Sequence, residues 1–257
     1  MPARKSPMRW VASRVRTVAR RWARRSHSLA RRALYAGTRR QCPVCAHSAR
    51  RFLPYGIVAR DDARCPACGS LERHRFVWLY LAQRTNLFDA RPKRVLHVAP
   101  EPCFAERFAK RIGPGYITAD LQPNLAAESI DIEHIPHRDG SFDAVYCSHV
   151  LEHVPDDRRA MTEMRRVLKD DGWALILVPI TTDRTIEDPS ITDPMERERL
   201  FGQHDHVRRY GRDFVQRLEE AGLGVTVVTV SQVARADDVV RLGLTAAAGE
   251  LYYCQRR

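Results

Sequence analysis

The feature that most constrains this chain is a series of short, almost unbroken apolar runs between residues 94 and 179. They occupy residues 95–99, 116–119, 142–147 and 173–178, and segments with helical spacing separate them. Strands without polar alternation are buried on both faces. The runs therefore predict a parallel sheet that is covered by helices on either side.

Polar residues follow three of these runs at the point where each strand should end. They lie in residues 99–103, at Asp120 and in residues 147–153. Open parallel sheets bind ligands at the carboxyl ends of their strands, near the position where the strand order reverses. We therefore expect these residues to line one rim of the sheet and to form the functional site.

Four motifs in this region occur in a specific order and spacing. They read Ser-Phe-Asp-Ala-Val at residues 141–145, Val-Leu-Glu-His-Val at 150–154, Glu-Met-Arg-Arg-Val-Leu-Lys at 163–169 and Gly-Trp-Ala-Leu at 172–175. Over residues 94–257 the chain thereby resembles the class I S-adenosylmethionine-dependent methyltransferases, in particular the small type 11 domain. The resemblance implies a Rossmann-like, seven-stranded, mostly parallel sheet with helices on both faces, and S-adenosyl-L-methionine as the cofactor.

The resemblance also assigns the cofactor contacts. Asp120 matches the acid that binds the ribose hydroxyls, and Asp131 and Ile132 match the positions that flank the adenine. The full expected set is Ala99, Pro100, Glu101, Asp120, Leu121, Asp131, Ile132, Cys147 and Ser148. One departure is that residues 99–103 contain no glycine, although relatives use glycine there for close backbone approach. Either the cofactor sits slightly differently in this chain, or the domain no longer binds it.

The positive charge of the chain is concentrated at its N-terminus. The net charge is +12 over 257 residues, yet residues 1–60 hold 16 basic and no acidic groups, whereas residues 61–257 hold 27 basic and 31 acidic groups. Apolar residues at spacings of three, four or seven predict a basic amphipathic helix over about residues 8–36. It is interpreted as a solvated arm, as a helix on an anionic membrane surface anchored by Trp10 and Trp22, or as an RNA-binding arm. We expect a cytoplasmic protein, peripheral at the inner membrane face if the arm binds lipid.

Two Cys-x-x-Cys pairs follow the arm. Cys42, Cys45, Cys65 and Cys68 have the spacing of a zinc ribbon, and four thiolates form a closed site whose role is structural. Disulfides are the alternative, but no recognisable signal sequence supports an oxidising compartment. Short strands at residues 51–53 and 57–59 are expected to bring the two pairs together.

A helix starting at about Ser70 should connect the ribbon to the main domain. We expect Arg73 and Arg75, near its start, to lie on an exposed charged face; contact with a phosphate or a carboxylate is the alternative. The predicted organisation is therefore an arm over residues 1–40, a zinc ribbon over 41–70, a connecting helix over 71–93 and a methyltransferase domain over 94–257.

Histidines near the rim are the candidate catalytic groups. His149 stands just after the apolar run at residues 142–147, and His153 follows one turn later. Histidine suits general-base catalysis near neutral pH. A second polar cluster occupies residues 201–211, where this fold commonly builds its substrate wall. His206, Arg208 and Tyr210 are the candidate substrate-binding residues.

Three functions remain open on these observations. The first is a methyltransferase that acts on a small-molecule, lipid-linked or glycan acceptor. The second is an RNA methyltransferase that holds RNA with the ribbon and the basic arm, which the slightly acidic main domain disfavours. The third is a non-catalytic zinc-ribbon interaction protein with a degenerate methyltransferase fold.

Overall fold

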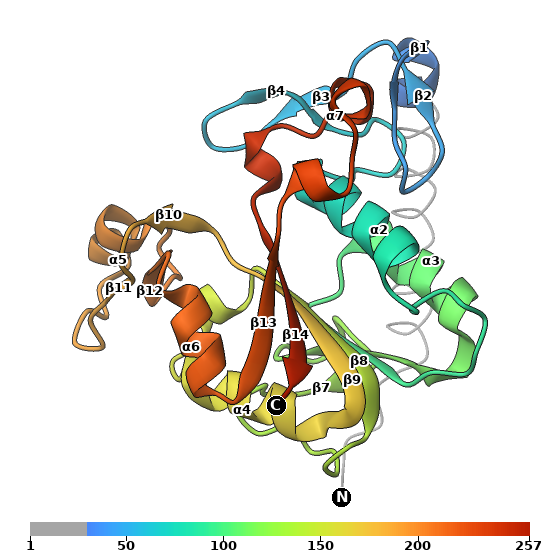
Figure 1. The fold of residues 1–257 in the computed structure, drawn as a ribbon. Coiled ribbons are helices and arrows are strands. Elements are labelled where there is room, and N and C mark those ends of the chain that lie inside the picture. Colours follow the sequence, from blue (N-terminus) through green and yellow to red (C-terminus); the bar gives the residue numbers. More distant parts are fainter. Residues whose placement is uncertain (1–29) are drawn as a thin grey trace, which may run out of the picture.

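The computed structural model describes residues 30–257, and most of the predicted arm helix lies outside them. A seven-stranded sheet forms the centre of the fold in the order β13-β14-β9-β8-β5-β6-β7, and β14 is antiparallel to both of its neighbours (Figure 1). Its strands are β5 (Val95–Val98), β6 (Tyr116–Asp120), β7 (Glu128–Ser129), β8 (Phe142–Ser148), β9 (Leu168–Leu177), β13 (Leu223–Val228) and β14 (Leu251–Arg256). The predicted seven-stranded, mostly parallel sheet is thereby confirmed.

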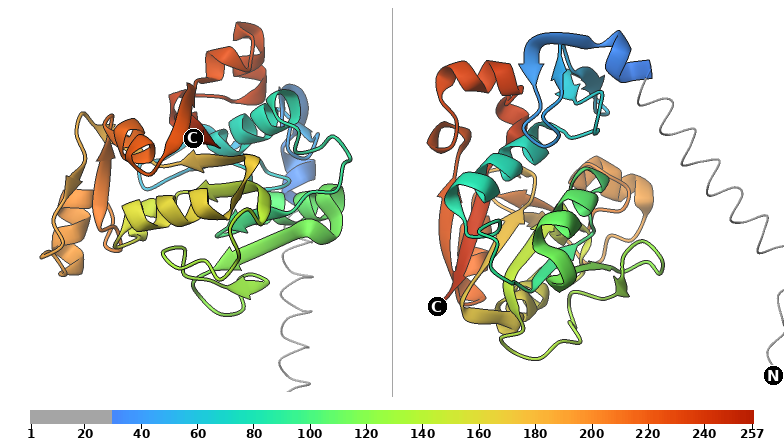
Figure 2. Two further views of the ribbon diagram at one scale, coloured as in Figure 1. Left: turned by 60° about the horizontal axis from the view of Figure 1, so that its bottom comes forward. Right: turned by 90° about the vertical axis from the view of Figure 1, so that its right-hand side faces the viewer.

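Side chains of each central strand alternate between two apolar cores, as the pleat of a β-strand requires. On one face, Val95 and Tyr146 pack with the helices α2 (Glu72–Arg84) and α3 (Pro102–Ile112). On the other face, Leu96 and Val145 pack with α4 (Asp157–Val167) and α6 (Phe214–Glu220) (Figure 2). Helices therefore cover both faces, which explains why the strands lack polar alternation.

The strand order reverses between β5 and β8. The chain runs outward from β5 to β6, through the 3₁₀ turn η1 (Gly113–Gly115), and on to β7, and then returns to add β8 and β9 on the other side of β5. The helix α4 (Asp157–Val167) ends just before β9, because Leu168 already pairs with Phe142 as the first residue of that strand. The reversal places the ends of β5, β6 and β8 next to one another at one rim.

Two small hairpins precede the main sheet. β1 (Ala36–Gln41) pairs with β2 (Ser48–Ala49), and β3 (Leu53–Tyr55) pairs with β4 (Arg60–Arg64). The expected strand at residues 57–59 is wrong, because these residues form the turn of the second hairpin, with Ile57 92% and Val58 82% exposed. The predicted boundary between residues 40 and 41 falls inside β1.

Arg75 of α2 ties the hairpins to a segment near the C-terminus, and our expectation that it is exposed is wrong. Its side chain is fully buried. The guanidinium donates hydrogen bonds to the carbonyls of Leu242 (2.7 Å), Gly243 (2.6 Å), Ala63 (2.8 Å) and Ser70 (2.9 Å). The segment that it holds includes η3 (Val230–Gln232), α7 (Ala236–Leu242) and η4 (Ala246–Ala248), and Figure 1 shows α7 beside the first hairpins.

A smaller three-stranded sheet stands beside the main one. It consists of β10 (Ile180–Thr182), β11 (Ile186–Glu187) and β12 (Arg208–Gly211), with β12 in the middle, and α5 (Pro194–Phe201) packs next to it. The 3₁₀ turn η2 (Leu151–His153) joins β8 to α4. Within residues 30–257, no helix has the length and apolar character that crossing a bilayer requires.

Candidate active site

The turn after β5 is anchored from below by a buried polar network. The Glu101 carboxylate accepts hydrogen bonds from His97 Nε2 (2.6 Å) and from the Tyr146 hydroxyl (3.0 Å), and His97 Nδ1 lies 2.7 Å from the Tyr116 hydroxyl. Burial opposes ionisation of Glu101, but the hydrogen bond and charge of His97 outweigh it and hold the pKa of Glu101 below its ordinary value. Glu101 therefore ties the turn after β5 to the side chains of His97 on β5 and Tyr146 on β8.

The backbone of this turn takes a conformation that normally calls for glycine. Ala99 has a φ of 47°, in the left-handed region, and its N–H donates to the carbonyl of Ala119 (2.7 Å). Holding a non-glycine residue there costs roughly 1–2 kcal/mol. The turn after β5 therefore contains a residue in the left-handed conformation, Ala99, although it has no glycine. Pro100 follows Ala99 directly.

The second part of the rim lies at the end of β6. Asp120 is half-buried, and its Oδ1 accepts a hydrogen bond from the Gln122 N–H (2.8 Å), while Oδ2 has no partner within residues 30–257. Leu121 beside it is 70% exposed. Asp131 is exposed and binds the Glu133 N–H, whereas Ile132 is buried. A free carboxylate oxygen next to an exposed apolar side chain fits a ribose and an adenine.

The third part of the rim is the end of β8. Cys147 is fully buried in the second core, and Ser148 is 6% exposed, with its Oγ 3.4 Å from His149 Nδ1. His149 has a φ of 55°, and its N–H bonds to the carbonyl of Leu177 at the end of β9 (2.9 Å). Burial, and then the positive charge of Arg73, lower the pKa of His149 to about 3. This imidazole is therefore neutral at pH 7.

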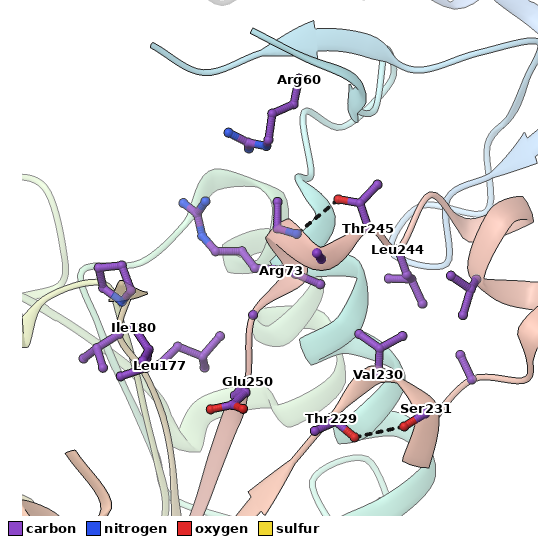
Figure 3. A pocket seen from close by; sticks show the side chains of 18 of the residues that line it. Arg60, Arg73, Leu177, Ile180, Thr229, Val230, Ser231, Leu244, Thr245 and Glu250 are labelled. Carbon is purple, nitrogen blue, oxygen red and sulfur yellow. Dashed lines mark hydrogen bonds between the residues drawn. The ribbon is translucent and has the colours of Figure 1, made fainter. Parts of the chain in front are cut away.

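His149 also lines a cavity of about 1180 Å³ that opens on the far side of β8 from Asp120. The walls come from the ends of β9 and β10, from α2 and the second hairpin, and from residues 229–250 (Figure 3). Ligand pockets commonly enclose about 300–1,000 Å³. The hollow is thus large enough for a small organic molecule, and His149 stands between it and the cofactor positions predicted from the sequence.

Three residues near η2 form a compact polar cluster. Glu152, His153 and His206 each offer a ligand atom within 4.8 Å of the others. Glu152 Oε2 and His206 Nε2 are buried with no partner in the described part of the chain. Burial raises the pKa of Glu152 to about 7, although nearby Arg73 opposes the shift. His153 lies 3.3 Å from Asp205 and packs edge-on against His206.

Two of the predicted substrate-binding residues, Arg208 and Tyr210, make hydrogen bonds inside the protein. Arg208 is 4% exposed and donates to the carbonyls of Leu151 (2.8 Å) and Pro155 (2.7 Å). Tyr210 is fully buried, and its hydroxyl donates to Asp157 (2.6 Å). Neither lines the cavity, nor does His206, which is 5% exposed. Their substrate role stays a prediction, while their contacts indicate that Arg208 and Tyr210 hold η2 and β12 together.

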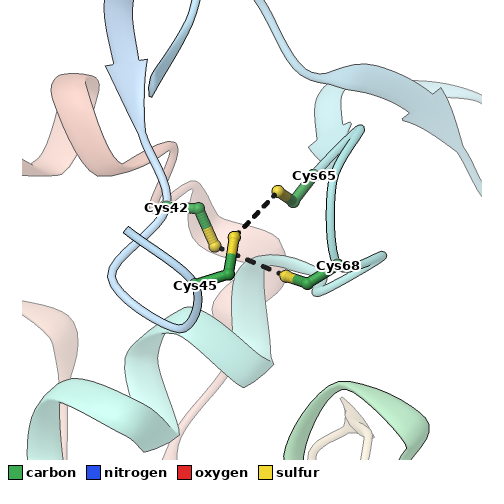
Figure 4. Close-up of side chains that lie close together, drawn as sticks. All are labelled: Cys42, Cys45, Cys65 and Cys68. Atoms are coloured by element: carbon green, nitrogen blue, oxygen red, sulfur yellow. Dashed lines mark hydrogen bonds between the residues drawn. The ribbon is translucent and has the colours of Figure 1, made fainter. Parts of the chain in front are cut away.

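The four predicted metal ligands converge between the two hairpins (Figure 4). Cys42 Sγ lies 3.7 Å from Cys68 Sγ, and Cys45 Sγ lies 3.8 Å from Cys65 Sγ, so none of these pairs is a disulfide. A tetrahedron with Zn–S bonds of about 2.3 Å has edges of about 3.8 Å. The Ser70 hydroxyl also contacts Cys42 Sγ (3.1 Å) and Cys68 Sγ (3.3 Å). The donor set and its spacing fit a zinc ion.

Arg73 and Glu152 are site residues outside the catalytic, cofactor-binding and substrate-binding sets predicted from the sequence. Arg73 lines the cavity, and its Nε is buried without a partner among residues 30–257. The sequence held a weak signal for each, since Arg73 begins the connecting helix and Glu152 precedes His153. Their burial depends on segments distant in sequence, which no local pattern reveals.

Part of the chain is similar in sequence to known proteins. Residues 83–176 match a family model described as a methyltransferase domain. An uncharacterised 37.1 kDa protein of a Streptomyces fradiae transposon is 34% identical over 130 residues, which are 47% of this chain and 36% of that protein. The uncharacterised methyltransferase YcgJ of Bacillus subtilis is 31% identical over 85 residues, 33% of this chain and 32% of that protein. The chain thus spans about a third of the length of these curated relatives.

Among solved structures, an S-adenosylmethionine-dependent methyltransferase from Mesorhizobium loti is similar. It has a TM-score of 0.49 at 16% identity, over 70% of this chain and 98% of that one.

Proposed function

We propose that this protein is an S-adenosylmethionine-dependent methyltransferase that acts on a small-molecule, lipid-linked or glycan acceptor. The observation that carries the proposal is the position of His149, between the predicted cofactor positions on β5 and β6 and a cavity of about 1180 Å³. A transfer in line from donor to acceptor needs two such compartments side by side. The methyltransferase-domain sequence of residues 83–176 supports the same reading.

The rim residues would hold the cofactor, which when bound supplies an activated methyl group. Asp120 has an unused Oδ2 for the ribose hydroxyls, and the exposed Leu121 with Ile132 offers an apolar surface to the adenine. Ala99 has a left-handed backbone conformation, so the first turn adopts the conformation that a glycine would give it. Cys147, which the sequence assigned to this site, is buried below it, so its backbone rather than its thiol would face the cofactor.

Proton handling falls to the groups that follow β8. With its pKa lowered to about 3 by burial and by Arg73, His149 is a weak base that stays neutral and can accept a hydrogen bond from an acceptor hydroxyl or amine. A catalytic base works best when its pKa lies near the operating pH. Burial raises the pKa of Glu152 to about 7, so Glu152 meets that condition better. It can take up a proton within the cluster that it forms with His153 and His206.

We further propose one structural zinc ion bound by Cys42, Cys45, Cys65 and Cys68. The sulfur spacing and the absence of disulfides support this assignment. A closed four-thiolate site leaves no open position for substrate, so the ion would stabilise the hairpins and take no part in catalysis.

The second candidate function is an RNA methyltransferase. A shallow hollow on the first hairpin is lined by Thr38, Arg39, Arg50 and Arg51, and these arginines suit phosphate contacts. The main domain carries more acidic than basic groups, which disfavours a long RNA footprint across it. A steeply salt-dependent RNA affinity that Arg50→Gln and Arg51→Gln remove would promote this function over a small-molecule acceptor.

Calorimetry with S-adenosyl-L-methionine tests the proposal. The wild-type protein should bind it, and Asp120→Ala should weaken binding by about 2–4 kcal/mol, because hydrogen bonds to a charged acceptor are lost. The control is Asp171→Ala, which removes an exposed carboxylate at the start of β9, away from the rim. No cofactor binding by the wild-type protein would instead support the non-catalytic function.

A further inference from the structure

The cavity beside His149 is built by parts of the chain that lie far apart in sequence. Arg60 comes from the second hairpin, Arg73 from α2, Ile180 from β10 of the smaller sheet, and Thr229 and Thr245 from the C-terminal segment. Figure 3 shows the Arg73 side chain reaching into the space between Arg60 and Ile180. A ligand in this cavity therefore meets the hairpin region as well as the methyltransferase domain.

Arg73 is a cavity cation with no ion-pair partner in the described part of the chain. Its Nε is buried and has no hydrogen-bond partner in the part of the chain that the structure describes, and no carboxylate lies within 4 Å of its guanidinium. The adjacent acid, Glu72, is occupied, because its carboxylate bonds to Arg60 at 3.0 Å. A buried donor without an acceptor is costly, and more so when it is charged. An anionic ligand would remove that cost.

The other charged groups at the cavity add to its positive potential. Arg212 and Arg235 lie on its exposed margin, and Arg212 comes no closer than 3.8 Å to Asp183. Glu250 is the acidic side chain of the lining, and it accepts a hydrogen bond from the Tyr252 hydroxyl (2.9 Å). The lining also has hydroxyl groups, with Thr229 and Ser231 hydrogen-bonded to each other at 3.1 Å.

We propose that this cavity binds a methyl acceptor that carries an oxyanion, either a phosphate or a carboxylate. Arg73 is the residue that binds this anion. The assignment rests on the proposed methyltransferase function, because it places the anion on the acceptor and not on the cofactor. The planar guanidinium presents its N–H groups as a fork that matches two oxygens of either anion. The hydroxyl-lined end then receives the polar remainder of the acceptor.

Anion binding would also change the state of His149. After burial, the positive charge of Arg73 is the next cause that lowers the pKa of His149, ahead of His74 and His206, while Glu101 acts in the opposite direction. An oxyanion on Arg73 offsets that charge and raises the pKa of His149. The imidazole would thus become a better proton acceptor when an acceptor molecule is in place.

The test uses NMR of the His149 side chain in the full-length protein, with inorganic phosphate and acetate as probes. A readout local to the cavity is needed because the arginine-rich N-terminus also attracts anions. At pH 7, phosphate or acetate should shift the His149 imidazole signal in the wild type, and Arg73→Gln should weaken this effect about tenfold or more. Arg73→Lys should retain part of it, and the control Arg84→Gln, which removes an exposed arginine bonded to the Gln232 carbonyl, should retain all of it.

S-adenosylhomocysteine provides the second arm of the test. If the anion belongs to the acceptor, Arg73→Gln leaves the affinity for this cofactor product unchanged. A tenfold loss of that affinity would instead assign Arg73 to the cofactor carboxylate and overturn the proposal, as would a phosphate response that Arg73→Gln leaves intact. If the wild type binds phosphate through Arg73 but binds no cofactor product, the oxyanion site stands and the methyltransferase function fails.

Discussion

Replacing Glu152 by glutamine should change how the stability of the protein depends on pH. Glu152 is 2% exposed, one carboxylate oxygen has no partner within residues 30–257, and burial raises its pKa from 4.5 to about 7. Its neutral form is therefore favoured in the folded state. The stability that this group contributes is fully present below pH 4.5 and is lost as the pH rises through 7.

The magnitude follows from the two pKa values. Each unit of difference is worth about 1.36 kcal/mol, so the total loss approaches about 3.4 kcal/mol, of which about 2.5 kcal/mol falls between pH 5 and pH 8. Glutamine cannot ionise and escapes this loss. The free energy of unfolding of Glu152→Gln, relative to the wild type, should therefore improve by about 2.5 kcal/mol over that interval.

Urea unfolding at constant zinc concentration measures this difference at pH 5, 6, 7 and 8. Asp171→Asn, which alters an exposed carboxylate on β9, is the matched control and should follow the wild type at every pH. Equal pH dependence of the wild type and Glu152→Gln would refute the reasoning. It would mean that water or a rearrangement of Arg73 or Arg208 satisfies the carboxylate in the folded protein.

Three further predictions concern the parts around the rim. The purified protein should contain one zinc ion per chain, and elemental analysis should find it lost in Cys65→Ser but retained in Cys254→Ala, whose thiol lies in the second core. Arg75→Gln should lower the free energy of unfolding by at least about 3 kcal/mol in urea, because buried carbonyls lose their donor, and should expose residues 229–250 to proteolysis, whereas Arg84→Gln should do neither. If the arm binds a membrane surface, anionic vesicles should shift the Trp10 and Trp22 fluorescence of the intact protein to the blue. Deleting residues 1–29 should then abolish vesicle binding and leave cofactor affinity unchanged; vesicle binding that survives the deletion would exclude the arm as the membrane contact.

The central sheet could be predicted because its signal is local. Unbroken apolar runs such as residues 173–178 are needed wherever helices cover both faces of a strand, and the two Cys-x-x-Cys pairs carry their geometry in their spacing. The turn at Ile57 and Val58 could not be predicted in this way. Those apolar side chains have strand character but lie at the tip of a hairpin, 92% and 82% exposed.

Buried charged residues account for most of what the sequence concealed. Arg75 and Arg208 both look like surface residues, since a charged side chain in a polar stretch is usually solvated. Each is buried because backbone carbonyls from elsewhere in the chain satisfy its guanidinium, in the case of Arg75 carbonyls 167 and 168 residues away. Glu152 differs from them, because it is buried with one carboxylate oxygen unpartnered within residues 30–257, and this burial raises its pKa.

The hydrogen bonds of Arg75 also set an order of events during synthesis of the chain. The four cysteines are complete once residue 68 is made, so the hairpins can take up metal early. Arg75, however, must wait for Leu242 and Gly243, which follow it by 167 and 168 residues. At translation rates of about 5–20 residues per second, this delay is roughly 8–33 s. The proposed zinc site can therefore form on a nascent chain, whereas the cavity beside His149 is complete only when the C-terminal segment leaves the ribosome.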